Sequence, residues 1–343
     1  MIPLAVDAMG GDFAPRNIIE GTGLALDSQP RIGPVFLVGD QAQIEAELER
    51  IGRVDDDRIK IVHSEQVVGM TESPAAAIRS KPDSSIAMAV DLVKKGQAMA
   101  MVSAGHTGAA VASSVLKLRP LPGIERPAIA TVFPGPRKQF LMLDAGASVD
   151  CRSQHLAQFA VMGEIYSRYI LNIDNPRVAL LNIGEEASKG NEQVKEAHHL
   201  LESLRKRGLN FVGNIQGSNM FDDLCDVLVC DGFVGNITLK CSEGTARFIS
   251  NFLNQYLRKN WCRRLGALLS RNAFRDLKAI ADQSEYGGAP LLGVNGICII
   301  GHGSSCSNAV ANALRVAGEA VEQQISQHIL ERMSELQIGN RKS

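Results

Sequence analysis

Short apolar runs alternate along the chain with segments in which apolar residues recur every three or four positions. The short runs are typical of strands buried in a parallel sheet. The periodic segments have the spacing of a helix that buries one face. We expect strands at residues 4–6, 35–38, 59–62, 98–102, 128–133, 140–143, 178–181, 211–212, 226–230 and 296–300. We expect helices at residues 15–26, 41–51, 75–80, 84–96, 153–171, 192–207 and 307–333.

This alternation of strands and helices predicts an α/β fold with three layers, α/β/α. Residues 134–137, Pro-Gly-Pro-Arg, form a turn that joins two strands directly. That turn predicts an antiparallel pair, so we expect a mixed, mostly parallel sheet. The 343 residues suffice for one domain over 1–343, or for two lobes that share a sheet. Residues 242–285 are expected to form a helical hairpin that protrudes from the sheet elements.

The helical hairpin carries an apolar stripe followed by a basic tip. The tip holds the single tryptophan, Trp261, with Leu265 and the basic residues Arg258, Lys259, Arg263, Arg264, Arg271 and Arg275. Such a mixture suits a membrane interface or an acidic partner. A dimer-forming hairpin whose basic tip is only solvated explains the same pattern equally well. Both can hold, with the stripe serving the dimer and the tip the membrane.

Glycine-rich polar loops follow most of the predicted strands. They lie at residues 7–12, 103–109, 143–148, 182–186 and 301–305. Loops at the carboxyl ends of parallel strands converge on one crevice of the sheet. Any single loop of this kind is most simply an ordinary tight turn, but their repetition favours a site built largely from backbone N–H groups.

The stretch 226–240 is the clearest junction of this kind. An apolar strand is followed by Gly232 and Gly235, which permit a sharp turn. We expect Asn236 to cap a helix that begins near Ile237, with Lys240 one turn further on. Because N–H groups at a helix N-terminus attract negative charge, this junction predicts an anion site.

Composition and missing motifs narrow the class of protein. Lys and Arg number 36 against 37 Asp and Glu, so no overall charge favours nucleic acid. The seven cysteines show no Cys-x-x-Cys spacing and no signal peptide is evident, which predicts reduced thiols and a cytoplasmic protein. Walker, complete Gly-x-Gly-x-x-Gly, Gly-x-Ser-x-Gly and His-Glu-x-x-His patterns are missing, so we expect no cofactor and no metal.

Several loop side chains are candidates for chemistry. His106 and His302 follow strands directly, and each is either a proton donor or a hydrogen-bonded bystander. Lys189 lies beside a glycine and is a candidate anion contact. Cys230 precedes Asp231, and a neighbouring carboxylate raises the pKa of a thiol, so Cys230 is predicted to be buried filler.

Several long motifs, in one order, resemble the phosphate acyltransferase family of bacterial phospholipid synthesis. They lie at residues 6–12, 103–109, 180–190, 213–217, 226–240 and 285–293. The run Asp-Gly-x-x-Gly-Asn-Ile at residues 231–237 also resembles phosphotransacetylases. Two positions differ from the family's usual pattern, because His106 and Ser148 stand where asparagine is common.

The resemblance implies a homodimer with an α/β/α fold like that of isocitrate dehydrogenase and phosphotransacetylase. It implies transfer of an acyl group from acyl carrier protein to inorganic phosphate, with the acyl phosphate passed to a membrane glycerol-phosphate acyltransferase. The protein would then be cytoplasmic, in peripheral contact with the membrane. The nearest alternative is a phosphotransacetylase-like enzyme that uses acyl-CoA. A dehydrogenase of the same fold and a non-enzymatic, membrane-associated scaffold for the carrier protein are the others.

An acyl transfer to phosphate needs groups that hold phosphate and stabilise an oxyanion. We expect catalytic roles for Lys189, His106, His302 and Asn236. We expect substrate contacts from Asp7, Gly10, Gly11, Asp12, Ser103, Gly105, Thr107, Gly108, Asp231, Gly235, Lys240, Gly303 and Ser304. Asp12 and Asp231 are expected to orient loops, and Lys240 to neutralise charge with Lys189. Docking of the acidic carrier or the membrane is expected from Arg258, Lys259, Trp261, Arg263, Arg264 and Leu265.

Overall fold

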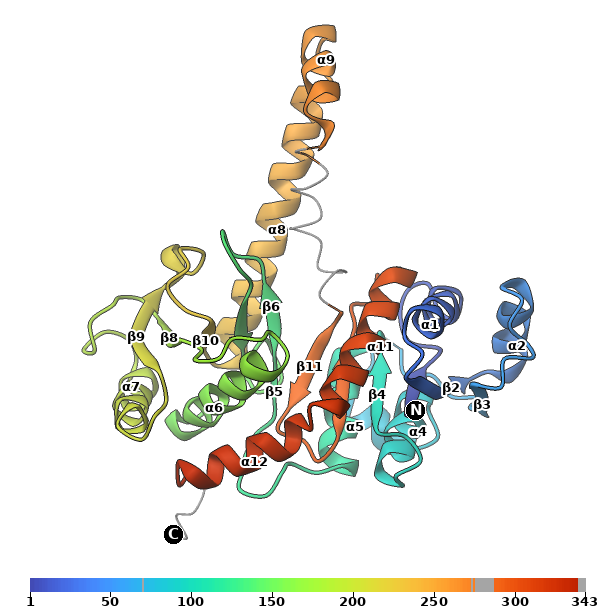
Figure 1. Ribbon diagram of the computed structural model, residues 1–343, viewed down its shortest axis with the longest axis horizontal. Coiled ribbons are helices and arrows are strands. Elements are labelled where there is room, and N and C mark those ends of the chain that lie inside the picture. The colour runs from blue at the N-terminus through green and yellow to red at the C-terminus, as the bar shows by residue number, and fades with distance from the viewer. Residues whose placement is uncertain (70, 273, 275–286, 339–343) are drawn as a thin grey trace.

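The structure is a computed structural model that describes residues 1–69, 71–272, 274 and 287–338. Figure 1 shows two groups of strands side by side, with helix α8 (Gly232–Leu257) rising from between them. Within the described residues, no helix combines the length and the hydropathy needed to cross a membrane.

The first group of strands is a seven-stranded sheet in the order β3-β2-β1-β4-β12-β11-β5. All its pairs are parallel except those that β11 makes with β12 and β5. Its strands are β1 (Ile2–Asp7), β2 (Ile32–Gly39), β3 (Ile59–His63), β4 (Ala100–Ser103), β5 (Ala128–Ile129), β11 (Ala289–Leu292) and β12 (Ile297–Ile300).

The second group is a five-stranded sheet in the order β6-β7-β10-β8-β9. Its strands are β6 (Thr131–Phe133), β7 (Phe140–Leu143), β8 (Val178–Asn182), β9 (Phe211–Gln216) and β10 (Val227–Val229). The β6–β7 pair is antiparallel, as the turn at residues 134–137 predicts, and the other pairs are parallel. The α/β class with mixed, mostly parallel pairing is therefore confirmed.

Helices cover both faces of the strands and complete the three layers. They are α1 (Arg16–Ser28), α2 (Gln41–Arg50), α3 (Pro74–Ser80), α4 (Ser85–Lys94), α5 (Thr107–Lys117), α6 (Ser153–Tyr169), α7 (Glu192–Arg205), α9 (Trp261–Leu269), α11 (Ser307–Glu322) and α12 (Ile325–Glu335). Helices α1, α2 and α11 share one core with the seven-stranded sheet. Helices α6, α7 and α12 share another with the five-stranded sheet.

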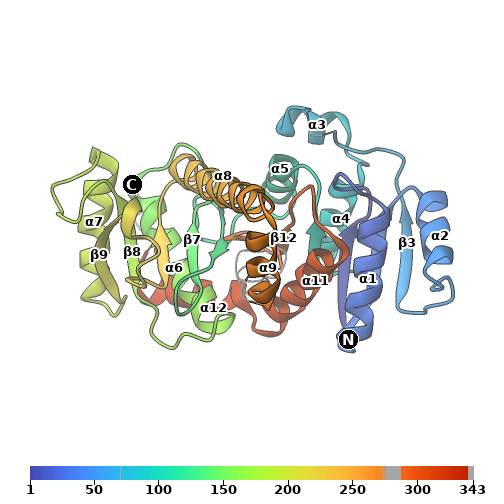
Figure 2. The ribbon, with the colours of Figure 1, turned by 90° about the horizontal axis from the view of Figure 1, so that it is seen from above.

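The third core joins the two sheets. It contains Met101 of β4 together with Met142 of β7 and Leu228 of β10, all fully buried. Leu239 of α8 packs against it. Figure 2 shows α8 lying between the two groups of strands. The division into one domain or two lobes stays a prediction.

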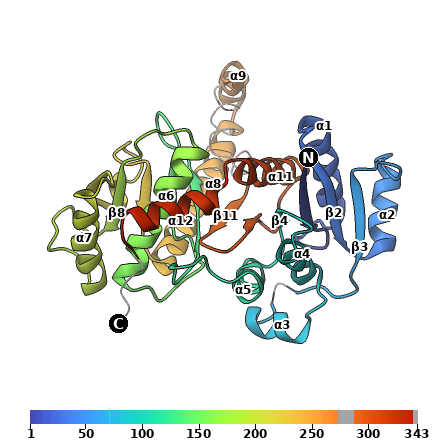
Figure 3. The same ribbon diagram turned by 60° about the horizontal axis from the view of Figure 1, so that its bottom comes forward.

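In the two sheets and in α11 and α12, three expected boundaries are wrong, and each error has a tertiary cause. The expected strand 128–133 is two strands, β5 and β6, which pair in different sheets. The expected helix 307–333 breaks at Gln324, which has a φ of 47°. Its halves pack on different partners, α11 on α1 and α12 on α6, so the chain crosses between the sheets (Figure 3). Strand β9 also continues beyond Val212, because residues 213–216 pair with β8.

The upper part of α8 and helix α9 stand clear of the sheets in Figure 1. Phe248 on α8 is 67% exposed and Trp261 on α9 is 75% exposed. The remainder of the expected hairpin, residues 275–285, lies outside the described residues, as does Arg275.

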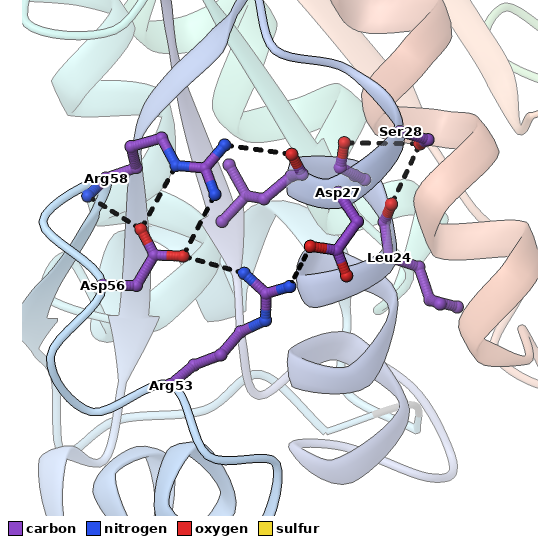
Figure 4. A network of polar contacts seen from close by, with 8 residues as sticks. Leu24, Asp27, Ser28, Arg53, Asp56 and Arg58 are labelled. Carbon is purple, nitrogen blue, oxygen red and sulfur yellow. Dashed lines mark hydrogen bonds and ion pairs between the residues drawn. The ribbon is translucent and has the colours of Figure 1, made fainter.

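A polar network fastens the edge of the seven-stranded sheet (Figure 4). Arg53 pairs with Asp27 at the end of α1 and donates to Asp56 over 2.8 Å. Arg58 also bonds Asp56 and donates to the carbonyl oxygen of Leu26 over 2.9 Å. Both arginines are thus paired with acidic residues. Their contacts connect the end of α1 to the start of β3, so this surface is not an unpaired basic patch.

Candidate active site

Loops from three neighbouring parallel strands meet at one edge of the seven-stranded sheet. The loops after β1 and β12 join where the N–H of Asp12 donates to the carbonyl oxygen of Gly303, over 2.7 Å. The loops after β1 and β4 touch so closely that a Cβ on Gly10 would lie 2.7 Å from the backbone nitrogen of Gly105. Gly11, with a φ of 110°, would bring a Cβ within 3.0 Å of the Gly303 oxygen. Only glycine therefore permits this close approach at residues 10 and 11.

Asp7 forms the floor of this meeting point. Its carboxylate is 2% exposed, and Oδ2 accepts a hydrogen bond from the hydroxyl of Ser103 over 2.7 Å. The N–H of Gly105 donates to the same hydroxyl over 3.1 Å, which leaves the hydroxyl proton for Asp7. Burial raises the pKa of Asp7, although the Ser103 hydroxyl and the nearby polar groups of Ser85 and of the Met9 backbone oppose that rise.

A pocket of about 200 Å³ opens above Asp7. Its lining combines small loop residues with apolar side chains: Asp7, Met9, Gly10, Gly11, Val67, Val68, Gly69, Ser85, Ile86, Gly105 and His106. Ser85 was not among the expected site residues; its signal is its position directly after the expected cap Ser84 and at the start of α4.

Helix α5 begins at the rim of this pocket with His106 as its N-cap. The Nδ1 of His106 accepts from the N–H of Ala109 over 3.3 Å, so in this role Nδ1 carries no proton and Nε2 carries it. An asparagine side chain would cap the helix in the same way. Within the described residues, the N–H groups of Thr107 and Gly108 have no hydrogen-bond acceptor. They are therefore available to an anion at the helix N-terminus.

Some polar groups of the loop after β12 are hydrogen-bonded to one another. The Nδ1 of His302 accepts from the N–H of Ser304 over 3.2 Å and lies 2.8 Å from its hydroxyl. The N–H of Gly303 has no acceptor in the part of the chain that the structure describes. This loop therefore offers Gly303 N–H to a ligand, while Ser304 N–H is already bonded.

A second set of loops gathers at the edge of the five-stranded sheet around Asp144. Its Oδ1 accepts from the N–H groups of Ile129, Gly146 and Ala147 over 2.8 to 3.0 Å, and Oδ2 accepts from Ser148 over 2.6 Å. Burial raises the pKa of Asp144 to about 6, with the four N–H groups acting in the opposite direction. Asp144 was not among the expected site residues, although its place in the glycine loop 143–148 was a signal.

Helix α8 begins at Gly232, so the expected start near Ile237 and the expected cap Asn236 are wrong. The cap is Asp231, whose Oδ1 accepts from the N–H groups of Phe233 and Val234 over 3.0 and 2.9 Å. The N–H of Gly232 donates to the carbonyl oxygen of Ser148. Since the first N–H groups of α8 already have acceptors, this terminus differs from that of α5 and does not present them to an anion.

The side chain of Asn236 nevertheless lies against the Asp144 loop. A Cβ on Gly146 would be 3.4 Å from the Cβ of Asn236. Gly235 packs directly on the backbone of Asp144, so α8 and this loop hold each other in place. Asn236 is exposed.

The two expected cations differ in their surroundings. Lys240 pairs with Glu243 over 2.9 Å, within the same helix. Lys189 is exposed in the loop after β8, and no ion pair of its ammonium group occurs among the described residues. The loop is anchored by Asn182, whose side-chain N–H donates to the carbonyl oxygen of Lys189 over 3.1 Å. Lys189 is thus the better placed of the two to meet an incoming anion.

Cys230 lies beneath the Asp144 loop, fully enclosed. Burial raises the pKa of its thiol well above the ordinary value, and Asp144 and Asp231 raise it further. A thiol of that kind is a poor nucleophile, which agrees with the expectation that Cys230 is buried filler.

The expected docking residues gather at the far end of α8 and on α9, away from both sets of loops (Figure 1). Lys259 lies over the ring of Tyr256, 5.5 Å from its centroid. Arg263 and Arg264 donate to backbone oxygens of Tyr256 and Arg258. Their positive charges have no acidic partner among the described residues, so they remain available to an anionic surface.

Comparison with solved structures defines the class of fold. A phosphotransacetylase from Streptococcus pyogenes superposes with a TM-score of 0.64 over 94% of each chain, at 20% identity. The EutD phosphotransacetylase from Staphylococcus aureus superposes with a TM-score of 0.59, at 16% identity. The fold is that of the phosphotransacetylase-type α/β proteins.

Sequence comparison defines the family. A family model described as "Fatty acid synthesis protein" matches residues 2–328. A phosphate acyltransferase of Pelotomaculum thermopropionicum is 48% identical over 335 residues, which cover 98% of this chain and 96% of that protein. A phosphate acyltransferase of Pelobacter propionicus is also 48% identical, over 98% of this chain and 95% of its own. The chain belongs to the phosphate acyltransferase family and is an enzyme of the transferase class.

Proposed function

We propose that this enzyme transfers a fatty acyl group from acyl carrier protein to inorganic phosphate, and so supplies acyl phosphate for phospholipid synthesis. The observation that carries this proposal is the start of α5, where the N–H groups of Thr107 and Gly108 lack acceptors among the residues that the structure describes. They lie beside the glycine loops of β1 and β12. Membership of a phosphate acyltransferase family makes inorganic phosphate the natural anion for these groups.

The reaction needs no covalent enzyme intermediate. A phosphate oxygen attacks the thioester carbonyl, the resulting oxyanion collapses, and the carbon–sulfur bond breaks to release a thiolate. The N–H groups of Thr107, Gly108 and Gly303 are suited to hold the phosphate and to stabilise the oxyanion. One donor to such an oxyanion is typically worth about 10² to 10³ in rate.

The remaining catalytic roles are proposed for side chains of both sets of loops. Lys189 meets the phosphate charge, and Asn236 donates its side-chain N–H to an oxygen of the reacting group. His106 carries its proton on Nε2 when it caps α5, so it is suited to donate a hydrogen bond that stabilises the departing thiolate, as is His302. Lys240 contributes less, because Glu243 already balances its charge.

The tip of α8 and α9 is proposed to contact the acidic carrier protein and the membrane. Arg258, Arg263 and Arg264 supply positive charge, and Leu268 and Leu269 supply exposed apolar surface. Carrier docking through exposed charges weakens with salt, since the screening length is about 8 Å at physiological ionic strength. If the Michaelis constant for acyl carrier protein does not change with salt concentration, this role of the basic residues is contradicted.

A homodimer is proposed to form through the apolar face of α8. Phe248, Ile249, Phe252 and Tyr256 are exposed along that helix in the single chain. Sedimentation of the wild type should give a dimer, and Phe248→Glu should shift it toward the monomer. A monomeric wild type would contradict the proposed dimer and would leave the proposed acyl transfer unaffected.

The main alternative function is that of a phosphotransacetylase-like enzyme that uses acyl-CoA, because the fold is shared with phosphotransacetylases. The test offers phosphate with long-chain acyl carrier protein in one assay and with the same acyl-CoA in another, and measures acyl phosphate as hydroxamate. We expect a higher kcat/KM with the carrier protein. A preference for acyl-CoA would support the alternative, and no acyl phosphate from either donor would contradict both.

A further inference from the structure

One buried oxygen in the pocket above Asp7 is unsatisfied. Oδ1 of Asp7 has no hydrogen-bond partner, and among the described residues it is the one buried carboxylate oxygen in that condition. The buried carboxylates of Asp144 and Glu164 use both of their oxygens. An unpaired buried acceptor destabilises the fold, so this oxygen is suited to a donor that arrives with a ligand.

Hydrogen bonds from the loop after β4 set the orientation of the Asp7 carboxylate. Gly105 donates to Ser103, and Ser103 donates to Oδ2 of Asp7. This chain of hydrogen bonds occupies Oδ2 and leaves Oδ1 without a partner among the described residues, on a side chain that lines the pocket. A Cβ on Gly10 would lie 2.5 Å from Oδ2, so the β1 loop also holds the carboxylate in place.

The walls of the pocket argue against an anion beside Asp7. Among the described residues, its lining contains no lysine or arginine, and Val67, Val68 and Ile86 supply apolar surface. A phosphate next to an ionised Asp7 would face a like charge with no cation to balance it. A narrow, uncharged chain that carries an N–H group fits these walls better.

We propose that the Asp7 pocket binds the amide-bearing arm of the thioester substrate, with Oδ1 of Asp7 accepting a hydrogen bond from an amide N–H. This inference rests on the proposed function, because it assumes a thioester carried on a pantetheine arm. Such an arm is uncharged between its phosphate and its sulfur and contains two amide groups. An N–H donated to Oδ1 favours the ionised form of Asp7 and offsets the effect of burial.

The arrangement separates the two substrates. Phosphate lies at the N–H groups of α5, and the thioester arm enters along Val67 and Ile86 to reach Asp7. His106 lines the pocket and also caps α5, so it stands between the two. Acyl carrier protein and acyl-CoA both carry this arm, so the pocket recognises chemistry that the two donors share.

The test is Asp7→Asn, which keeps the size of the side chain but presents an N–H group where Oδ1 accepts. We expect the KM for acyl-pantetheine and for acyl carrier protein to rise about tenfold, the effect of about 1.4 kcal/mol, while the KM for phosphate changes less than about twofold. An equal rise with acyl-CoA would show that the shared arm is read, and a rise confined to the carrier protein would contradict it. The control is Asp57→Asn, an exposed aspartate on a distant loop, which should change neither constant.

Other outcomes overturn the assignment. If Asp7→Asn raises the KM for phosphate and spares the thioesters, Asp7 serves phosphate; if it changes neither KM, Asp7 contacts no substrate. Should this variant fail to fold, Val67→Trp provides a second test, because Val67 is 40% exposed at the pocket and its replacement narrows the entrance. Val67→Trp should raise the KM for the thioester substrates and leave the KM for phosphate unchanged. Thermal stabilisation of the wild type by pantetheine itself, without turnover, separates failure of this inference from failure of the acyl-transfer proposal.

Discussion

A Cβ atom on Gly235 would lie only 1.9 Å from the backbone oxygen of Asp144, which makes this the tightest glycine contact in the described structure. Helix α8 therefore rests directly on the loop that Asp144 organises. Asn236, a proposed catalytic residue, is the next residue along the helix and shares this support.

Gly235→Ala should therefore displace α8 from the Asp144 loop and lower the free energy of unfolding by about 1 to 3 kcal/mol or more, as for an overpacked core. It should also lower kcat, because Asn236 moves with the helix. Gly244→Ala in the same helix is the matched control, since nothing lies within 4 Å of its added Cβ. That variant should be neutral or gain up to about 1 kcal/mol. Equal denaturation midpoints for the two variants would contradict the packing argument.

Arg332 anchors α12 to α6 through a buried carboxylate. Glu164 is 1% exposed on its side chain and accepts from Nε and NH2 of Arg332, each over 3.0 Å, and from Arg168. Arg332→Ala should lower the free energy of unfolding by about 3 kcal/mol, because it leaves a buried charge half paired. Glu335→Ala removes only an exposed partner of Arg332 and should change the free energy by less than about 1 kcal/mol. Urea denaturation of both variants provides the comparison.

Asp226 should contribute stability that acid removes. Burial opposes ionisation, but hydrogen bonds from Arg177 and Lys138 lower its pKa below the ordinary value of 3.8. A carboxyl whose pKa is lower in the folded state stabilises the fold above the unfolded value, and this stability is lost as the pH falls through the folded pKa. Asp226→Asn should therefore be less stable than the wild type at pH 7, by about 1 to 3 kcal/mol. The difference should shrink below pH 4, and a constant difference from pH 7 to pH 3 would contradict this assignment.

Lys189→Ala should weaken phosphate binding, because it removes the exposed cation of the β8 loop. A hydrogen bond to a charged group is worth about 1.5 to 3 kcal/mol, so the KM for phosphate should rise about tenfold or more. Lys206→Ala, another exposed lysine at the end of α7, is the control and should leave that constant unchanged. An unchanged phosphate KM in Lys189→Ala, together with an unchanged kcat, would remove Lys189 from the site.

Trp261 should report membrane contact directly, since it is the single tryptophan of the chain. Its side chain is largely exposed, so its emission should shift to the blue when vesicles containing anionic lipid are added. Each Lys or Arg near such a surface adds about 1 kcal/mol of attraction. Arg263→Glu combined with Arg264→Glu should abolish the shift, while vesicles of zwitterionic lipid alone should produce a smaller one. The same shift in all samples would mean that charge plays no part.

How much could be predicted from the sequence differs between the helices and strands on one side and the candidate active site on the other. Most strands and helices lie where the apolar spacing puts them, because that spacing is a local property of the chain. The break at Gln324 could not be predicted, since no glycine or proline marks it and its cause is the choice of partners by α11 and α12. The start of α8 was misplaced because Asn236 and Asp231 are both good helix caps in sequence, and only the contact with Ser148 selects Asp231.

The site divides in the same way. The sequence by itself determined that glycine-rich loops follow the strands, that many of them carry polar residues, and which family the motifs resemble. Only the tertiary structure decided which N–H groups remain unbonded within the described part of the chain, those of Thr107 and Gly108 rather than those at the start of α8. The physical reason is that a hydrogen-bond donor is satisfied by whichever acceptor folding brings within about 3 Å, and acceptors such as Ser148 come from far along the chain.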